Sequence, residues 1–182
     1  KSVLNQKYKS NVVIATSTPN EYIYSLANKY HLKVNINPNP GKGIGYDFDY
    51  AISCGMTKLV TIAHQDDYYE PQYSELIIKK LQSNPDALIA YSDYFEEKDG
   101  KKIERTFNLK VKRLMLRTIS LFPKSKLWRT RVLAFGNAIC CPSVSYDLSV
   151  LNGFKFDEKL KGNLDWIAWY QIGKMKGTFL YV

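Results

Sequence analysis

At residues 58–67 the chain reads Lys58-Leu59-Val60-Thr61-Ile62-Ala63-His64-Gln65-Asp66-Asp67. The apolar first part predicts a buried strand over residues 58–63, and His64 and two aspartates follow at its carboxyl end. Open α/β sheets bind their ligands at that edge. Adjacent carboxylates there can hold a hard divalent cation and leave coordination positions for phosphate oxygens. Because adjacent aspartates after a strand also form turns and cap helices, the pair by itself leaves a structural role open.

Strand-like and helical segments alternate on both sides of this stretch. Before it, we expect strands at 11–15 and 32–36 and helices from about 18 to 30 and from 44 to 54, with Thr18 as the N-cap of the first helix. After it, we expect a helix at about 72–81, a strand at 87–95, a strand near 138–145, a helix after Leu164 and a strand from Thr178. The alternation predicts one layered α/β domain over residues 1–182.

The composition is that of an ordinary globular domain. The 182 residues are 45% hydrophobic and 24% charged, which excludes a disordered chain, and no apolar run approaches the roughly 18 residues that a bilayer span needs. The three cysteines, Cys54, Cys140 and Cys141, are an odd number without metal-type spacing. They indicate a reducing compartment, so we expect a cytoplasmic protein. Cys140 and Cys141 are expected to pack in the core rather than to act as nucleophiles.

The positive charge is concentrated in one segment. The formal net charge is +9, and eight basic residues without any acid lie between Lys110 and Arg131, interleaved with Leu, Met, Ile, Phe and Trp. Such a segment predicts an amphipathic helix that suits an anionic membrane surface or a phosphorylated substrate better than nucleic acid. A solvated helix face is the alternative.

A further acid, Asp165, opens a segment rich in apolar and aromatic residues, among them Trp166, Trp169 and Tyr170. The segment predicts a helix. An acid at a helix start either caps the N-terminus or is available as a general base, and the surrounding sequence explains both roles equally well.

In this order, the pieces resemble the inverting family 2 glycosyltransferases of GT-A fold, across essentially the whole chain. The segment from Ser2 to Tyr8 resembles the end of that family's first helix, and residues 41–51 resemble its Gly-rich loop and following helix. The other matching pieces are the donor-binding turn at 16–18, the metal motif at 63–67 and the acceptor-site motifs at 153–157 and 164–166. The resemblance implies a Rossmann-like α/β fold with a mixed, mainly parallel sheet flanked by helices.

The resemblance also implies roles for individual residues. Asp67, with Asp66, would hold a divalent cation, Mn²⁺ or Mg²⁺, with His64 as a further metal or phosphate contact. Asp165 would be the catalytic base, and Trp166 and Asn137 would lie on the acceptor side. The donor-binding residues would be Thr16, Ser17, Thr18, Gly43, Asp47 and Asp66.

The implied partners are a nucleotide-sugar donor, a glycan or lipid-linked acceptor and an anionic membrane surface, with no nucleic acid. We therefore expect a transferase of cell envelope polysaccharide biosynthesis, cytoplasmic and peripheral at the inner face of the membrane. Two other classes stay open. One is a sugar-phosphate nucleotidyltransferase, and the other is a non-enzymatic basic module that binds membranes or RNA.

The sequence departs from the family pattern at three places. Ile14, Ala15 and Thr16 stand where nucleotide-contacting acids are expected, His64 replaces the first acid of the metal motif, and Leu164 replaces a glutamate before the base. The resemblance further implies a fragment that lacks the first strand and the C-terminal part. If so, Ser2 to Lys7 are helical, and the strand at 12–15 borders a position that no strand fills.

Overall fold

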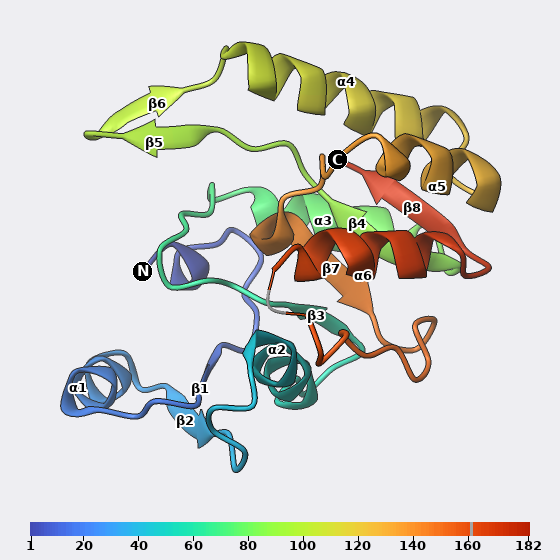
Figure 1. Cartoon of the computed structure of the whole chain (residues 1–182). Coiled ribbons are helices and arrows are strands. Elements are labelled where there is room, and N and C mark those ends of the chain that lie inside the picture. The colour runs from blue at the N-terminus through green and yellow to red at the C-terminus, as the bar shows by residue number, and fades with distance from the viewer. Residues whose placement is uncertain (161) are drawn as a thin grey trace.

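The computed structural model describes residues 1–160 and 162–182, which form an α/β domain (Figure 1). Its elements in chain order are η1 (Ser2–Leu4), β1 (Val13–Thr16), α1 (Glu21–Tyr30), β2 (Lys33–Ile36), α2 (Ile44–Ser53), β3 (Leu59–Thr61), α3 (Tyr73–Gln82), β4 (Ala87–Tyr91), β5 (Glu96–Lys98), β6 (Lys101–Ile103), α4 (Phe107–Leu121), α5 (Lys126–Ala134), η2 (Cys141–Ser143), β7 (Val144–Asp147), α6 (Leu164–Gly173) and β8 (Thr178–Tyr181).

Four strands form the central sheet, in the order β3-β7-β4-β8. Strand β7 runs antiparallel to both β3 and β4, and β8 runs parallel to β4, so β7 is the one reversed strand of this sheet. Strands β1 and β2 form a separate parallel pair. The expected mixed sheet of mainly parallel strands is confirmed.

The central sheet is buried on both faces. Helix α3 covers one face, where Ile77 and Leu81 pack with Ala90 and Leu180. The larger cluster on the other face includes Tyr146 and Phe179 of the sheet and Trp169 of α6, all fully buried. All five residues of β4 are buried, as expected for a strand with helices on both sides.

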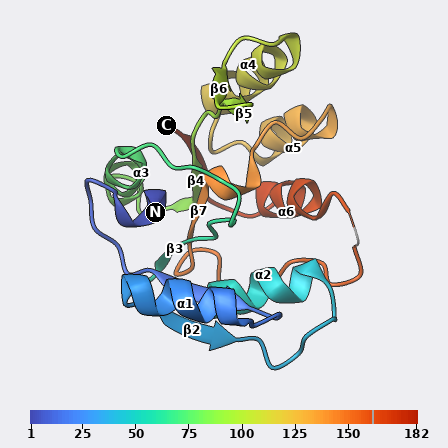
Figure 2. The ribbon, with the colours of Figure 1, turned by 90° about the vertical axis from the view of Figure 1, so that its left-hand side faces the viewer.

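Different helices and strands lie at the two ends of the molecule. Helix α1 and strands β1 and β2 lie at one end, and helices α4 and α5 lie side by side at the opposite end, as both views show (Figures 1 and 2). Within the described residues, no helix has the length and apolar character needed to cross a membrane.

Two expectations concern the N-terminal part of the chain: an unpaired edge of the first strand and a helix from Ser2 to Lys7. Among the described residues, β1 pairs with β2 and with no other strand, so its second edge is unpaired, as predicted. The expectation of a helix from Ser2 to Lys7 is wrong beyond Leu4. Gln6 is buried and bonds instead to the start of α3: its Nε2 donates to the Glu70 carbonyl at 3.0 Å, and its Oε1 accepts from the Ser74 N–H at 2.9 Å.

Two further boundaries differ from the sequence-based expectation. The N-cap of α1 is Asn20, whose side chain accepts from the Ile23 N–H at 2.9 Å, whereas the Thr18 N–H bonds back to Thr16 Oγ1 at 3.1 Å. The strand expected near 138–145 begins only at Val144, because Pro142 lacks an N–H and lies in the short helix η2.

Candidate functional site

The carboxyl ends of three strands meet at one edge of the central sheet. Thr61 of β3 lies opposite Ser145, and Tyr91 of β4 lies opposite Val144, so the first residues of β7 adjoin both strand ends. Tyr91 is also level with Tyr181 of β8. The loop after β3 therefore lies beside the segment that leads into β7. The Tyr69 hydroxyl fixes this neighbourhood by donating to the Pro142 carbonyl at 2.6 Å.

His64, Asp66 and Asp67 form a cluster of metal-binding groups in the loop after β3. One ligand atom from each lies within 4.8 Å of the other two, and His64 Nδ1 is 3.6 Å from Asp67 Oδ2. Partial burial raises the pKa of Asp67; the nearby His64 lowers it and Asp66 raises it further. The sequence-predicted metal residues are thus brought together.

The imidazole ring of His64 is oriented so that Nδ1 faces the carboxylate of Asp67. Its ring packs against Phe48 of α2, with the centroids 5.3 Å apart, and its Nε2 is buried without a hydrogen-bond partner among the described residues. The Nδ1 atom faces Asp67. Carboxylates suit Mg²⁺ and Mn²⁺, and first-row transition ions also accept imidazole nitrogen. The three donors could therefore hold a divalent cation, and the mixed set fits Mn²⁺ better than Mg²⁺.

Asp165 and Asn137 form a second polar pair. Asn137 follows α5, and its Nδ2 donates to Asp165 Oδ2 at 2.6 Å. The N-cap position of α6 belongs to Asn163, and Asp165 lies inside the first helical turn. The N-cap alternative for Asp165 is therefore wrong, although an acid in a first turn still complements the helix dipole.

The amide orientation of Asn137 is fixed by chemistry. Only its NH₂ group can donate to the carboxylate, so Oδ1 points elsewhere, and that oxygen is buried without a partner among the described residues. Buried polar atoms are nearly always hydrogen-bonded, so this oxygen is an exception within the described residues. The neighbouring Trp166 donates its indole N–H to the Leu133 carbonyl at 2.7 Å and so ties α6 to α5.

Cys140 and Cys141 lie between the two acidic groups. Burial, and after it the charges of Asp67 and Asp165, raise the pKa of the Cys140 thiol to about 11. Burial and the same two carboxylates hold the pKa of Cys141 at about 12. Both carboxylates thus act on the same two thiols from one edge of the sheet, and the thiols stay protonated, as expected for packing residues.

The predicted donor side is organised by Asn37, a residue that the sequence did not single out. Asn37 is buried after β2; its N–H donates to the Thr16 carbonyl at 2.8 Å, and its Nδ2 donates to Asp47 Oδ1 at 2.9 Å. Thr16 and Asp47 are therefore linked through one residue, by the backbone N–H and the side-chain amide of Asn37. Ser17 and Thr18 follow β1, and Thr18 is exposed.

Two further residues, Gly43 and Phe48, position helix α2 on the predicted donor side. Gly43 is the N-cap of α2 with a φ of +112°, a conformation that favours glycine. Phe48, one residue after Asp47, packs on His64 and joins α2 to the acidic cluster. In the sequence, Asn37 is distinguished only by its position between a predicted strand and Pro38.

Comparison with known proteins agrees with this architecture. The model of Glycosyl transferase family 2 matches residues 1–145. Of 39 matching chains of known structure, one is TarS residues 1–349 from S. aureus in complex with UDP, with a TM-score of 0.66 and 14% sequence identity. The match covers 100% of this chain and 54% of that one, so this chain spans about half of its length. No curated protein matches the chain. The expected GT-A fold is confirmed.

Proposed function

Because the chain belongs to glycosyl transferase family 2, we propose that it transfers a sugar from a nucleotide-sugar donor to a hydroxyl of a glycan or lipid-linked glycan, with inversion at the anomeric carbon. The observation that carries this proposal is the placement of two carboxylate groups at one sheet edge. One is the cluster of His64, Asp66 and Asp67, and the other is Asp165 with Asn137. The first suits a divalent cation that can bind a diphosphate, and the second suits a reacting hydroxyl.

On the donor side, His64, Asp66 and Asp67 would hold a divalent cation. When bound, such a cation neutralises the negative charge that grows on the departing diphosphate. Thr16, Asn37 and Asp47 form a hydrogen-bonded group on the neighbouring elements and would contact the nucleoside. The bound UDP of TarS makes uridine diphosphate the first probe to use.

On the acceptor side, Asp165 acts as the general base. The acceptor hydroxyl oxygen attacks the anomeric carbon from the face opposite the diphosphate. A new C–O bond forms while the bond from carbon to the phosphate oxygen breaks, and the hydroxyl proton moves to Asp165. Asn137 donates to Oδ2, and in this scheme the proton is assigned to the other carboxylate oxygen, Oδ1.

Asn137 is a positioning residue in this scheme. Its NH₂ group holds the carboxylate of Asp165 in one orientation. Trp166, whose indole is held by the Leu133 carbonyl, adds an aromatic surface next to the base.

Product analysis tests this function directly. Incubation with manganese and a panel of nucleotide sugars should release a nucleoside diphosphate, with the sugar recovered on an acceptor. Release of pyrophosphate from a sugar phosphate and a nucleoside triphosphate would instead assign the chain to the nucleotidyltransferases. A function that survives unchanged in Asp165→Asn would favour a non-enzymatic binding module.

A further inference from the structure

Helix α4 has a second apolar face that nothing in the described chain covers. Its inner face packs Leu109, Leu116 and Ile119 in the core. On the outer side, Phe107, Val111, Leu114 and Leu121 recur at helical spacing, and Phe107, Leu114 and Leu121 are 83%, 65% and 66% exposed. The inner apolar stripe is sufficient to pack α4 against the core, so the exposure of the outer apolar stripe requires a separate explanation.

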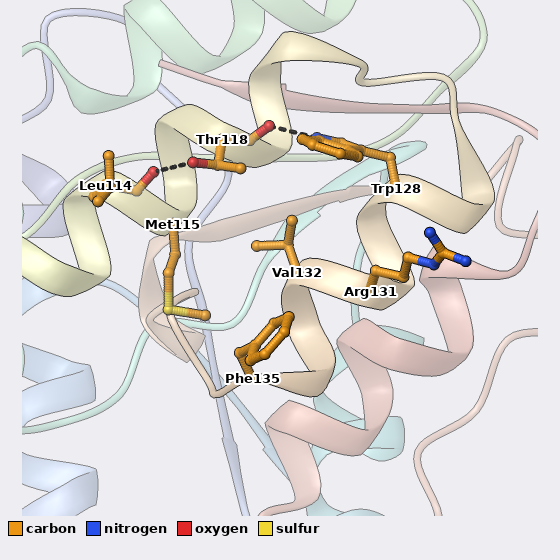
Figure 3. A pocket seen from close by; sticks show the side chains of 7 residues that line it. All are labelled: Leu114, Met115, Thr118, Trp128, Arg131, Val132 and Phe135. Atoms are coloured by element: carbon orange, nitrogen blue, oxygen red, sulfur yellow. Dashed lines mark hydrogen bonds between the residues drawn. The ribbon is translucent and has the colours of Figure 1, made fainter.

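Helix α5 continues this apolar surface. Leu127 and Phe135 are 62% and 89% exposed and lie at i and i+8, with Arg131 between them at i+4. A groove of about 360 Å³ runs between the helices; Leu114 and Met115 line it from α4, and Val132 and Phe135 from the side of α5, with Arg131 at its rim (Figure 3). The Trp128 indole N–H donates to the Thr118 carbonyl at 2.7 Å and holds the two helices together.

The charge on this surface has one sign. No Asp or Glu occurs from Arg105 to Tyr146. Four basic residues of the segment have partners within the chain: Arg113 pairs with Asp93, Lys124 pairs with Asp86 at the surface, Lys112 bonds Tyr94, and Arg129 is buried and bonds backbone carbonyls. The remaining four, Lys110, Arg117, Lys126 and Arg131, are exposed.

We propose that the α4–α5 face, formed by Phe107, Val111, Leu114, Leu121, Leu127 and Phe135 with the four exposed basic residues, docks on an anionic lipid bilayer. Leucine and phenylalanine side chains enter the boundary between headgroups and acyl chains, and the flanking lysines and arginines pair with lipid phosphates. The apolar side chains extend along both helices beyond the groove, and all charged residues within α4 and α5 are basic. A planar anionic surface matches both features at once.

The location of this face has a consequence that rests on the proposed function. Phe135 stands two residues before Asn137, which bonds Asp165. Docking through α4 and α5 would hold the acceptor side of the site near the membrane, where the head of a lipid-linked acceptor is found. Binding to vesicles needs neither donor nor catalysis, so its failure and the failure of the proposed function are separable.

Vesicle flotation of the full chain tests the docking. The chain should float with vesicles of phosphatidylglycerol and phosphatidylcholine, and remain unbound with phosphatidylcholine alone. Replacing Lys110, Arg117, Lys126 and Arg131 by Gln should lower partitioning on the order of 100-fold or more, because each basic residue near an anionic surface contributes about fivefold. The matched control replaces Lys7, Lys33, Lys58 and Lys79 by Gln, removes the same charge and should bind nearly as the unaltered chain does.

A second pair of variants tests the apolar part. Replacing Leu114, Leu127 and Phe135 by Ser should also abolish flotation, whereas replacing the exposed Tyr22, Met56 and Leu76 by Ser should not. Equal loss in both charge variants, or no flotation of the unaltered chain, would overturn the proposal. So would a concentration-dependent dimer that the Leu114/Leu127/Phe135 variant loses without any vesicle binding, since the face would then serve a second copy of the chain.

Discussion

For single residues, the proposed chemistry depends on the carboxylate of Asp165. Among the described residues, Asn137 donates to its Oδ2, and the proposal assigns the proton of the acceptor hydroxyl to Oδ1. Asp165→Asn keeps the shape but cannot take a proton. We expect donor binding to be retained and transfer to fall by roughly 100- to 10,000-fold, the usual contribution of a general base. The comparison is a single-turnover assay beside Asp99→Asn, an exposed turn residue that should transfer at the unaltered rate.

The positioning role of Asn137 predicts a shift in the pH profile. Asn137→Asp places a second carboxylate against Asp165, and two carboxylates this close retain a shared proton to higher pH. The base must be ionised to act, so the acid limb of the kcat profile should move to higher pH and activity should recover as pH rises. Asn137→Ala should lower kcat more than it raises KM. A uniform loss of activity at every pH in the Asp variant would show that Asn137 only packs.

The two adjacent cysteines give a prediction that needs no substrate. Because burial raises the pKa values of Cys140 and Cys141 to about 11 and about 12, almost no thiolate is present at pH 8. Neither should react with iodoacetamide in the native protein at that pH, whereas all three cysteines should react in denaturant. Mass spectrometry locates the label. Rapid native labelling of Cys140 would contradict the packing role.

At the scale of elements, Arg129 of α5 joins the segments around α6 and β8. It is fully buried, and its guanidinium donates to the Gly173 and Met175 carbonyls at 2.9 and 2.8 Å and to the Pro123 carbonyl at 2.7 Å, while it stacks over Phe179. Arg129→Leu leaves these carbonyls unpaired and should lower the free energy of unfolding by at least about 3 kcal/mol. Arg131→Leu, two residues away on the exposed side, should change it by less than about 0.5 kcal/mol in the same urea titration. Equal effects would contradict this account.

Local sequence signals predicted the presence of helices and strands more accurately than the residues at which they begin and end. Helix α2 was expected at 44–54 and runs from Ile44 to Ser53, since its apolar spacing and the preceding Gly-rich loop are local features. The helix at Ser2 to Lys7 failed because Gln6 bonds residues far along the chain. The β5–β6 hairpin was not predicted, since its short strands are almost wholly exposed and carry no alternating apolar pattern.

The same distinction between local and long-range signals applies to the residues of the candidate site. The loop at 64–67 was predictable, because its three metal-binding groups are adjacent in sequence and follow one strand. Asn37 was not, because its role comes from two partners on separate elements, Thr16 and Asp47. Asn137 was expected on the acceptor side through the resemblance alone, and its bond to Asp165 spans 28 positions, which no local pattern encodes.

In the fold as a whole, the acidic cluster and the Asp165 pair both lie near Cys140 and Cys141, in the segment before β7. Phe48 on His64 joins the cluster to the half of the chain that contains β1, β2 and α2. Asn137 joins Asp165 to the half that contains α4, α5 and α6. In the proposed function, donor and acceptor are therefore bound by different parts of the fold, and a change in one part should leave binding by the other intact.

Calorimetric binding of UDP and GDP with and without manganese tests this division most directly. The unaltered chain should bind at least one of these nucleotides in a manganese-dependent way, and Asp165→Asn should bind it with the same affinity. Asp67→Ala should lose most of the manganese-dependent affinity, because the charge between protein and diphosphate is removed. Manganese-dependent binding that is unchanged in Asp67→Ala, or that is lost in Asp165→Asn, would contradict the assignment of donor and acceptor to these two carboxylates.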